Sequence, residues 1–533
     1  MSTFRIWPIS GLTVLAFGAH AQAPALAWQA FFDGNLPGID IANALIVAPD
    51  NTVYVTGESA NFAPQGTITT IRYGIEGTQL WADHPYGPAQ EAMNRGSAMA
   101  IDPWSHVYVA GTIANNSGDF ALIKYGPNGR LWKKNYEQYP GADVPDECHG
   151  LAIDGLGNAY MAGHITSTAG MGLDTYVIKT DSAGNTLWAD NLSLSSIDED
   201  LTGVVVSPGG NVYVAGDWWD TQQEGGVNIG TARYSPEGTR LWNEGFPMPM
   251  VDDRAMRVST TANDHALICG TAMGVTDMDL VAFERDADDN LVWEVVHDGT
   301  ASGNDEAVDI AQLASGPVAV TGHTREEVDG QLRHAITTML VENGQVLWTR
   351  HFYGEPGLGA WPLRMTTDLQ GNIFIAGYAT AAGGTTTDGT IVKYGIAGDL
   401  QWSISYDAGA DQNDRFNDIA LNAAGDVIVC GAAFTTTTAS RYLTVQYGNA
   451  VGVNDPFVGN ETANVFPNPV STRLNINAPT HQRPCEVFNA LGERVLVAST
   501  PLSIDVSAWN EGLYFLRTNN GIRSTTSRFT VQH

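Results

Sequence analysis

Short apolar runs alternate with turn residues along most of this chain. The clearest run is VYVAG at 107–111, which lies between segments rich in Pro, Ser, Asn and Gly. β-branched and aromatic residues placed between such turn residues are typical of strands joined by hairpins. The pattern therefore predicts an all-β protein built from many short strands.

The VYVAG line recurs eight times, and a glycine ends each copy. These glycines are Gly57, Gly111, Gly163, Gly216, Gly270, Gly322, Gly377 and Gly431. They are 54, 52, 53, 54, 52, 55 and 54 residues apart. Each copy holds four strand signals: an apolar run, the VYVAG line, a line such as LIKYG (122–126), and a strand containing Leu-Trp. Four strands in a repeat of this length are typical of one β-propeller blade.

The Leu-Trp strand indicates how the repeats close. Its tryptophans are Trp81, Trp132, Trp188, Trp242, Trp293, Trp348 and Trp402. The eighth copy ends at 444–448 without one, whereas Trp28 lies 53 residues before Trp81 in the N-terminal run 25–34. We therefore predict an eight-bladed β-propeller over residues 24–450, closed by this N-terminal strand, because an open seam exposes unpaired backbone groups. Each Trp ring is expected to pack on a neighbouring blade.

The repeat resembles a family of bacterial propeller repeats named for a seven-bladed propeller. The likeness lies in an Ala-Ile-Ala-Val-Asp-type strand, the Gly-Asn-Val-Tyr-Val-Thr-Gly-type line, and Lys-Tyr before Gly and Leu-Trp. It covers residues 25–450, although this chain has eight copies. The resemblance implies a scaffold and no particular activity.

Charge divides the chain into two parts. The formal net charge is −32, which argues against nucleic acid or an anionic membrane as a partner. From Asn464 onward there are six Arg, no Lys and four Asp or Glu, a balance of +2, so the rest carries −34. The shift predicts a domain boundary, with a linker at 451–463 and a second domain at 464–533.

The N-terminus has the features of a secretory signal peptide. Arg5 precedes the apolar run 9–18, and Ala19 and Ala21 fit a cleavage site, so residues 1–21 are expected to be removed. No later stretch approaches about 20 apolar residues. We expect an exported monomer without a transmembrane segment.

Residues 464–533 form a different all-β pattern, predicted to be a small β-sandwich. They resemble the type A sorting domain of the type IX secretion system of Bacteroidota. The residues that carry the likeness are Phe466, Pro467, Asn468, Pro469, Gly492, Gly512 and Tyr514. The resemblance implies that the secretion machinery is a partner, and that the domain directs passage across the outer membrane. It also implies later cleavage, with the protein released or attached to the surface. A small immunoglobulin-like adhesion module is the alternative.

The four cysteines show no metal-binding spacing. Cys269 and Cys430 occupy matching positions just before repeat glycines, while Cys148 and Cys485 stand elsewhere in their segments. We predict that Cys269 and Cys430 are small buried strand residues rather than a disulfide.

Acidic residues recur 17 positions before the repeat glycines. Six of the eight positions are acidic: Asp40, Asp146, Glu199, Asp253, Asp305 and Asp414. A ring of carboxylates at one end of the propeller is a hypothetical calcium site, because Ca²⁺ prefers oxygen ligands. The favoured alternative is that these side chains cap turns by accepting backbone N–H groups.

Charged residues also occur 13 positions before four of the glycines. They are Arg257, Asp309, Arg364 and Asp418. We predict salt bridges between neighbouring strands, in preference to a polar ligand surface, because unpaired charges near a core are costly. His149 and His164 lie in one repeat, and hydrogen bonding within strands is favoured over metal ligation.

No HExxH, GxSxG or P-loop motif occurs in the chain. The leading interpretation is a secreted or surface-attached, non-enzymatic binding module with an unidentified glycan or protein ligand. The alternative is a glycan hydrolase or lyase with its site at the propeller rim, and a structural surface-layer role is the third. A cluster of His, Arg, Tyr and carboxylate at one end favours the enzyme, and a flat acidic rim favours binding.

Overall fold

A computed structural model of the chain divides into two compact units, residues 1–449 and 450–533. It describes residues 23–448 and 464–533. Within these ranges, the segments left out are 35, 37, 61–65, 87–93, 114–118, 137–145, 167–171, 193–198, 221–225, 246–252, 355–356, 410–411, 467–468, 478–484, 490–493, 499–502 and 520–523. The expected signal peptide and linker lie outside the described residues. In the part described, the secondary structure is all strand, as predicted.

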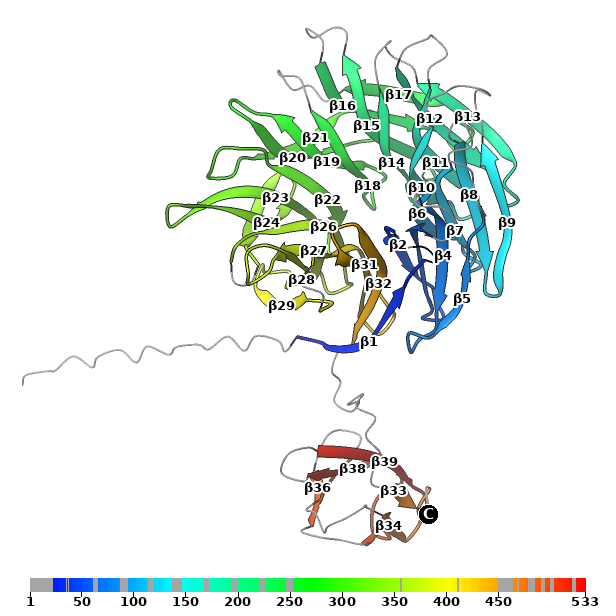
Figure 1. Cartoon of the computed structure of the whole chain (residues 1–533), viewed down its shortest axis with the longest axis vertical. Helices are drawn as coiled ribbons and strands as arrows, with labels where there is room; N and C mark the ends of the chain where they lie inside the picture. The colour runs from blue at the N-terminus through cyan, green and yellow to red at the C-terminus, as the bar shows by residue number, and fades with distance from the viewer. Residues whose placement is uncertain are drawn as a thin grey trace, which may run out of the picture. The chain divides into compact units, whose positions relative to one another are not determined.

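The described residues of the first unit form eight four-stranded antiparallel sheets (Figure 1). Sheet 1 comprises β2 (Ile41–Val47), β3 (Val53–Ser59), β4 (Thr67–Tyr73) and β5 (Gln79–Asp83). Sheet 2 comprises β6 (Arg95–Ile101), β7 (Val107–Ile113), β8 (Asp119–Gly126) and β9 (Gly129–Tyr136). Sheet 3 comprises β10 (Glu147–Ile153), β11 (Ala159–Thr166), β12 (Leu173–Thr180) and β13 (Thr186–Leu192). Sheet 4 comprises β14 (Asp200–Val206), β15 (Val212–Asp220), β16 (Gly226–Tyr234) and β17 (Arg240–Gly245).

The remaining four sheets follow the same order. Sheet 5 comprises β18 (Arg254–Thr260), β19 (Ala266–Met273), β20 (Met278–Arg285) and β21 (Leu291–His297). Sheet 6 comprises β22 (Glu306–Gln312), β23 (Val318–Val328), β24 (Gln331–Glu342) and β25 (Gln345–Phe352). Sheet 7 comprises β26 (Ala360–Thr367), β27 (Ile373–Thr380), β28 (Thr387–Tyr394) and β29 (Leu400–Tyr406). Sheet 8 comprises β30 (Asp414–Leu421), β31 (Val427–Thr436), β32 (Ala439–Gly448) and β1 (Ala25–Phe32).

The first strands of the sheets contact one another in a cycle. The contacts run from β2 through β6, β10, β14, β18, β22, β26 and β30, and β30 contacts β2. Figure 1 shows these first strands toward the middle of the unit, with fourth strands such as β9, β13 and β17 at its periphery. The first strands therefore form the inner surface, and the Leu-Trp strands the outer one.

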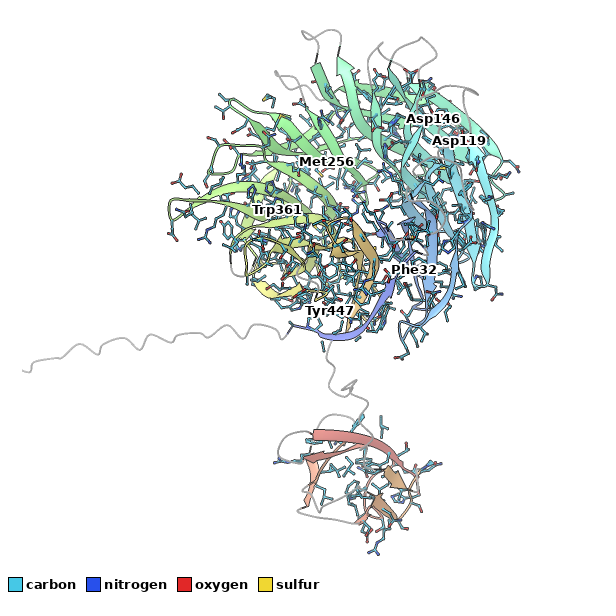
Figure 2. The ribbon with its side chains drawn as sticks, viewed as in Figure 1. Phe32, Asp119, Asp146, Met256, Trp361 and Tyr447 are labelled. Atoms are coloured by element: carbon cyan, nitrogen blue, oxygen red, sulfur yellow. The ribbon has the colours of Figure 1, made fainter. Side chains whose placement is uncertain are left out.

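The N-terminal strand completes the last sheet, as the Trp spacing predicted. β1 pairs antiparallel with β32, with Gln29 opposite Val445. Phe32, at the end of β1, packs edge-on against Tyr442 of sheet 8, with ring centroids 5.8 Å apart, and also contacts His84 beyond sheet 1 (Figure 2). The first strand of the chain thus joins sheet 8 to sheet 1.

Indole rings of the fourth strands bridge adjacent sheets, which confirms the predicted packing. Indole N–H groups donate to carbonyls of the next sheet in four cases: Trp81 to Pro127, Trp188 to Pro236, Trp242 to Ala287, and Trp348 to Ile396. Trp81 also stacks on Tyr125, with ring centroids 5.2 Å apart. These repeated contacts serve architecture, because the four indoles lie on the hairpins of neighbouring sheets.

A bulge explains the repeat glycines. In every sheet the pairing of first and second strands shifts by one residue, as between Ala42 and Ala44 of sheet 1. The bulge presses one backbone carbonyl against each repeat glycine. This carbonyl belongs to the residue 16 positions earlier in the chain. A Cβ on Gly57 would lie 1.9 Å from the Ile41 oxygen, and one on Gly163 would lie 1.9 Å from the Glu147 oxygen. Only glycine permits this approach, so the repeat glycine fixes where each first strand begins.

The strand directions place the same loops at one end of the unit. Ile41 at the start of β2 pairs with Glu58, and Ser59 pairs with Thr67 at the start of β4. The starts of the first strands, the loops between second and third strands, and the ends of the fourth strands therefore share one end. We call this end the leading face.

The second unit has two antiparallel sheets around one core. One sheet has the order β33 (Asn464–Phe466), β34 (Arg473–Asn477), β37 (Ser503–Asp505). The other has the order β36 (Arg494–Ala498), β35 (Cys485–Asn489), β38 (Gly512–Asn519), β39 (Ser524–Val531). Leu474, Val487 and Phe529, from both sheets, belong to one buried cluster.

Candidate functional site

The leading face begins with the acidic residues found by the 17-residue count. Four of them accept a hydrogen bond from the backbone N–H 20 positions further on, at 2.8 Å each: Asp40 from Ala60, Asp146 from Thr166, Asp253 from Met273, and Asp305 from Arg325. Asp414 accepts from the N–H of Ala408 at 2.6 Å, and Glu199 is buried. The first four bonds tie the residue before a first strand to the second strand or to the residue just after it, which is the capping role.

The structure does not gather the six acidic residues around one point. The described residues form three clusters of His, Cys, Asp or Glu spaced for a metal ion, and none contains any of the six. Burial raises the pKa of Asp146, Asp305 and Asp414 to about 6. The calcium hypothesis for this set remains a prediction.

The charged residues found by the 13-residue count form the salt bridges predicted for them. Arg257 Nε lies 3.5 Å from Asp309 Oδ1, and Arg364 Nε lies 3.8 Å from Asp418 Oδ1. Each pair joins the first strands of neighbouring sheets. Asp418 also accepts the Leu45 N–H of sheet 1 at 2.8 Å, which links the last sheet to the first.

The cysteines that the structure describes fully are buried thiols. Cys148, Cys269 and Cys430 are free and buried, which confirms the prediction for the latter two. Burial raises the pKa of all three thiols well above the usual range. They are therefore packing residues and not nucleophiles.

A second set on the leading face escaped the sequence analysis. It lies one position further along, 16 residues before the repeat glycines, at the start of each first strand. We call these the rim residues: Ile41, Arg95, Glu147, Asp200, Arg254, Glu306, Trp361 and Arg415. Each pairs with the residue after a repeat glycine, and these partners include Glu58, His164, Asp217, His323 and Tyr378. Counting 16 instead of 17 positions back from each repeat glycine would have found the rim residues.

Rim residues of sheets 2 to 4 form a polar network. Arg95 Nη2 lies 2.8 Å from Glu147 Oε2. Asp200 Oδ1 is hydrogen-bonded to His164 Nδ1 at 2.9 Å, and its Oδ2 lies 3.3 Å from His149 Nε2. Burial opposes ionisation of Asp200, but the two neighbouring histidines outweigh burial and lower its pKa to about 2. Burial alone would lower the pKa of His164. The hydrogen bond to Asp200 and its negative charge outweigh burial, so the pKa of His164 is raised.

Sheet 6 carries a long hairpin on this face. Its β23 and β24 have 11 and 12 residues and extend to a two-residue turn, Asp329–Gly330, with Val328 paired to Gln331. Both turn residues have positive φ, 54° and 71°, as a type I′ turn requires. The sequence signals were the Asp-Gly pair and the longest repeat spacing, 55 residues. We call residues 323–334 the sheet 6 extension.

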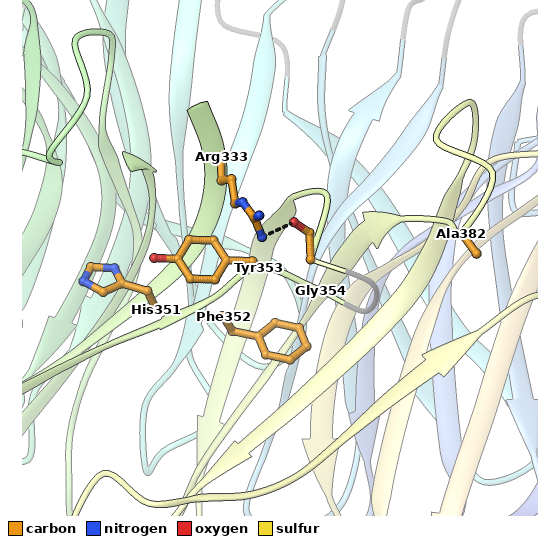
Figure 3. Close-up of a pocket in the computed structure, with 7 residues that line it drawn as sticks. Arg333, His351, Phe352, Tyr353, Gly354 and Ala382 are labelled. Carbon is orange, nitrogen blue, oxygen red and sulfur yellow. Dashed lines mark hydrogen bonds between the residues drawn. The ribbon is translucent and has the colours of Figure 1, made fainter. Parts of the chain in front are cut away.

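A pocket of about 730 Å³ opens beside this extension (Figure 3). Its lining comprises Arg333, His351, Phe352, Tyr353, Gly354, Gly357 and Ala382. Arg333 Nη1 donates to the Gly357 carbonyl at 2.9 Å, and the His351 and Tyr353 rings are stacked with centroids 6.4 Å apart. The pocket therefore combines a cation, an imidazole and a phenol.

A carboxylate lies behind the pocket. Glu326 Oε1 is 3.4 Å from His351 Nδ1 and accepts from Thr324 at 2.7 Å, while Oε2 accepts from Thr300 at 2.7 Å. Burial opposes ionisation of Glu326, but these hydrogen bonds prevail and lower its pKa. Burial also lowers the pKa of His351 and raises that of Tyr353. Near neutral pH the site holds an ionised carboxylate, a neutral imidazole and an intact phenol.

Aromatic rings continue from the pocket toward sheet 7. His334 and Trp361 have centroids 4.9 Å apart, and Trp361 stacks on Tyr378 at 5.3 Å. Gly359 joins the pocket to this series, because a Cβ there would lie 3.1 Å from the Trp361 ring and 3.4 Å from His334. Figure 2 marks Trp361 well apart from Asp146, which directly precedes β10 of sheet 3. The series places stacked, half-buried rings beside the polar pocket.

Residues 464–532 match the secretion system C-terminal sorting domain. The match indicates export by type IX secretion to the cell surface or extracellular space, with cleavage of the C-terminal domain. Within the sorting domain Tyr514 is buried, stacks on Phe529 and donates to the Asn510 carbonyl at 2.8 Å. Phe466 is the last residue of β33, the first strand of this domain. Pro469 is exposed, and Gly512 is the first residue of β38. Pro467, Asn468 and Gly492 lie outside the described residues.

The solved structures that resemble the chain do so at low identity. A Bacteroides caccae protein of unknown function is 15% identical, with 56% of this chain and 93% of that chain covered and a TM-score of 0.33. Polysaccharide lyase Uly1 is 11% identical, with 80% and 97% covered and a TM-score of 0.40. A gluconolactonase from Xanthomonas campestris is 9% identical, with 66% and 98% covered and a TM-score of 0.30. At these TM-scores the alignments assign no activity to this chain.

No curated protein matches the chain. Among the described residues there is no helix with the length and apolar character needed to span a membrane.

Proposed function

We propose that residues 24–450 form an eight-bladed β-propeller whose leading face binds an extracellular saccharide. The cyclic contacts of the eight first strands and the pairing of β1 with β32 support the propeller. The sorting domain supports a site of action outside the cell.

The observation that carries the binding proposal is the pocket beside the sheet 6 extension. Its volume of about 730 Å³ suits one to a few sugar rings. Sugars offer hydroxyl groups to polar side chains and C–H faces to aromatic rings, and this site presents both next to each other. Trp361 and Tyr378 supply half-buried aromatic rings beside the pocket, and Arg333, His351 and Tyr353 supply the polar groups.

Arg333 narrows the class of saccharide. It is the one cationic side chain among the residues that line the pocket, and its guanidinium retains N–H donors beyond the one given to Gly357. Guanidinium groups pair with carboxylates in a planar, two-bonded geometry. We therefore propose a saccharide that carries a carboxylate, such as a uronic acid.

A second candidate function, lyase activity, is favoured by the Glu326–His351–Tyr353 arrangement. In β-elimination a base removes the hydrogen on the carbon next to the uronate carboxyl group. The neighbouring C–O bond then breaks, a C=C bond forms, and the leaving oxygen takes a proton. Neutral His351, held by Glu326, suits the base, Tyr353 suits the proton donor, and Arg333 suits the carboxylate.

The test applies the full chain to a panel of neutral, sulfated and uronate-containing polysaccharides. Retention measures binding, and ultraviolet absorbance of a new C=C bond measures elimination. We expect Arg333→Gln to weaken retention at least tenfold, and Arg240→Gln, on the outer strand of sheet 4, to leave it unchanged. Retention of no saccharide, or equal retention by Arg333→Gln, would overturn the binding proposal. Absorbance that disappears in both His351→Gln and Tyr353→Phe would establish the second candidate.

A further inference from the structure

Two histidines and an aspartate meet between sheets 3 and 4, on different sheets from the pocket. His149 lies on β10, His164 on β11 and Asp200 on β14. One donor atom from each residue lies within 4.8 Å of the others. The sequence placed the two histidines in one repeat, and the structure adds the carboxylate from the next.

The spacing of the donors suits a transition-metal ion. Zinc binds histidine nitrogen and carboxylate oxygen at about 2.0–2.2 Å, so neighbouring donors of a tetrahedral site lie roughly 3–3.5 Å apart. Asp200 Oδ2 lies 3.3 Å from His149 Nε2, and Asp200 Oδ1 lies 2.9 Å from His164 Nδ1. The imidazole planes are inclined by 51°, with centroids 5.5 Å apart, so the rings do not cover each other.

One nitrogen of the cluster lacks a hydrogen bond. His149 Nε2 is shielded from solvent and has no hydrogen-bond partner, although it faces the Asp200 carboxylate. A shielded polar atom without a partner is costly, and metal coordination at this nitrogen would remove that cost.

A fourth oxygen and an outer partner lie close by. Glu147 Oε2 is 4.0 Å from His149 Nε2, and Arg95 holds that same oxygen at 2.8 Å. Charged groups behind a ligand orient it and tune its affinity for metal. The net charge of −32 also raises the local concentration of cations.

We propose that His149, His164 and Asp200 bind a divalent transition-metal ion of the zinc type, with Glu147 within reach as a fourth ligand. Two imidazoles exclude calcium and magnesium as the preferred ions, because those take oxygen ligands. The ion would join sheet 3 to sheet 4 at the rim. The proposal is independent of the saccharide pocket.

The test is zinc titration of the full chain by calorimetry, after metal has been removed with chelator. We expect His149→Gln and Asp200→Asn each to lose one equivalent of bound Zn²⁺ relative to the unaltered chain. His265→Gln is the matched control, since His265 pairs with Glu284 of sheet 5, away from this cluster, and should retain that equivalent. His351→Gln separates this site from the cluster of His297, Glu326 and His351, and should also retain it.

A second measurement does not depend on the variants folding. Co²⁺ added to the unaltered chain should give the visible absorption of a tetrahedral site and should be displaced by Zn²⁺. Circular dichroism verifies that each variant is folded. No bound Zn²⁺ in the unaltered chain, or the same number of equivalents in His149→Gln and Asp200→Asn, would overturn the proposal.

Discussion

At the scale of single residues, the buried carboxylate of Asp418, inside the first strand of sheet 8, makes stability depend on pH. Burial raises the pKa of Asp418 to about 6, against hydrogen bonds from Leu45 and Ile419 and the charge of Arg257. A carboxyl group whose pKa is higher in the folded state binds its proton more tightly there. Its contribution to stability is complete below the ordinary pKa and is lost as pH rises through about 6.

Replacing Asp418 should therefore flatten the pH dependence. Asp418→Asn removes the titrating group, so we expect its free energy of unfolding to fall less between pH 5 and pH 7.5, by roughly 1–1.5 kcal/mol, than that of the unaltered chain. Urea unfolding at several pH values measures this, with Asp329→Asn in an exposed turn as the control. Equal slopes for Asp418→Asn and the unaltered chain would contradict the assignment.

Hairpin glycines that contact an indole form a second residue-scale feature. Gly238 has a φ of +90°, and a Cβ there would lie 2.5 Å from the Trp188 ring of the preceding sheet. Gly330 has a φ of +71° but nothing within 4 Å of such a Cβ. Both glycines have a positive φ, but only Gly238 lies against an indole ring.

This pair separates backbone strain from loss of packing. We expect Gly330→Ala to lower the free energy of unfolding by about 1 kcal/mol, from φ alone. Gly238→Ala should lower it by roughly 2–3 kcal/mol, because the methyl group also displaces Trp188. Chemical denaturation of both variants checks this, and equal losses would mean that the indole contact between sheets contributes little.

At the scale of elements, β1 holds the first and last sheets together. It covers the edge of β32, and Trp28 donates to Gln446 at 2.8 Å while its ring lies against Gly77 and Tyr73 of sheet 1. An uncovered β32 would expose its backbone groups to pairing with another chain. The strand thus acts on two sheets at once.

Removing the Trp28 ring should weaken that joint. We expect Trp28→Ala to cost about 2 kcal/mol of unfolding free energy, since the ring is partly buried, and to increase self-association as β1 detaches. Leu369→Ala is the control, because that side chain is 85% exposed and should cost little. Thermal unfolding and light scattering measure both effects. A Trp28→Ala chain as stable as Leu369→Ala would show that closure does not depend on this indole.

At the scale of the whole molecule, the repeats made most of the fold predictable and left the site obscure. Strand order, the closing strand and the indole contacts all follow from a period that one sequence displays eight times. The Arg257–Asp309 pair followed too, because equivalent positions of neighbouring repeats lie side by side. The repeat period of the sequence identifies only the features that all eight repeats have in common.

The candidate site was hidden because it depends on what one repeat does differently. His351 and Arg333 come together only through the sheet 6 extension, and Glu326 reaches His351 from another strand of the same sheet. Asp200 joins His149 across two sheets at a position that the 17-residue count misses by one. The strand register and the bulge decide which side chains meet in this way. Counting residues back from a repeat glycine does not reveal either of them.

The most direct test of the account is to locate the saccharide on the full chain by hydrogen–deuterium exchange. With a polysaccharide that the chain retains, we predict slower amide exchange in residues 331–335 and 351–360, and no change in the equivalent segments of sheet 2. Arg333→Gln should abolish the effect at the same saccharide concentration. Slower exchange on other sheets alone, or in the sorting domain, would contradict the claim that this pocket is the functional site.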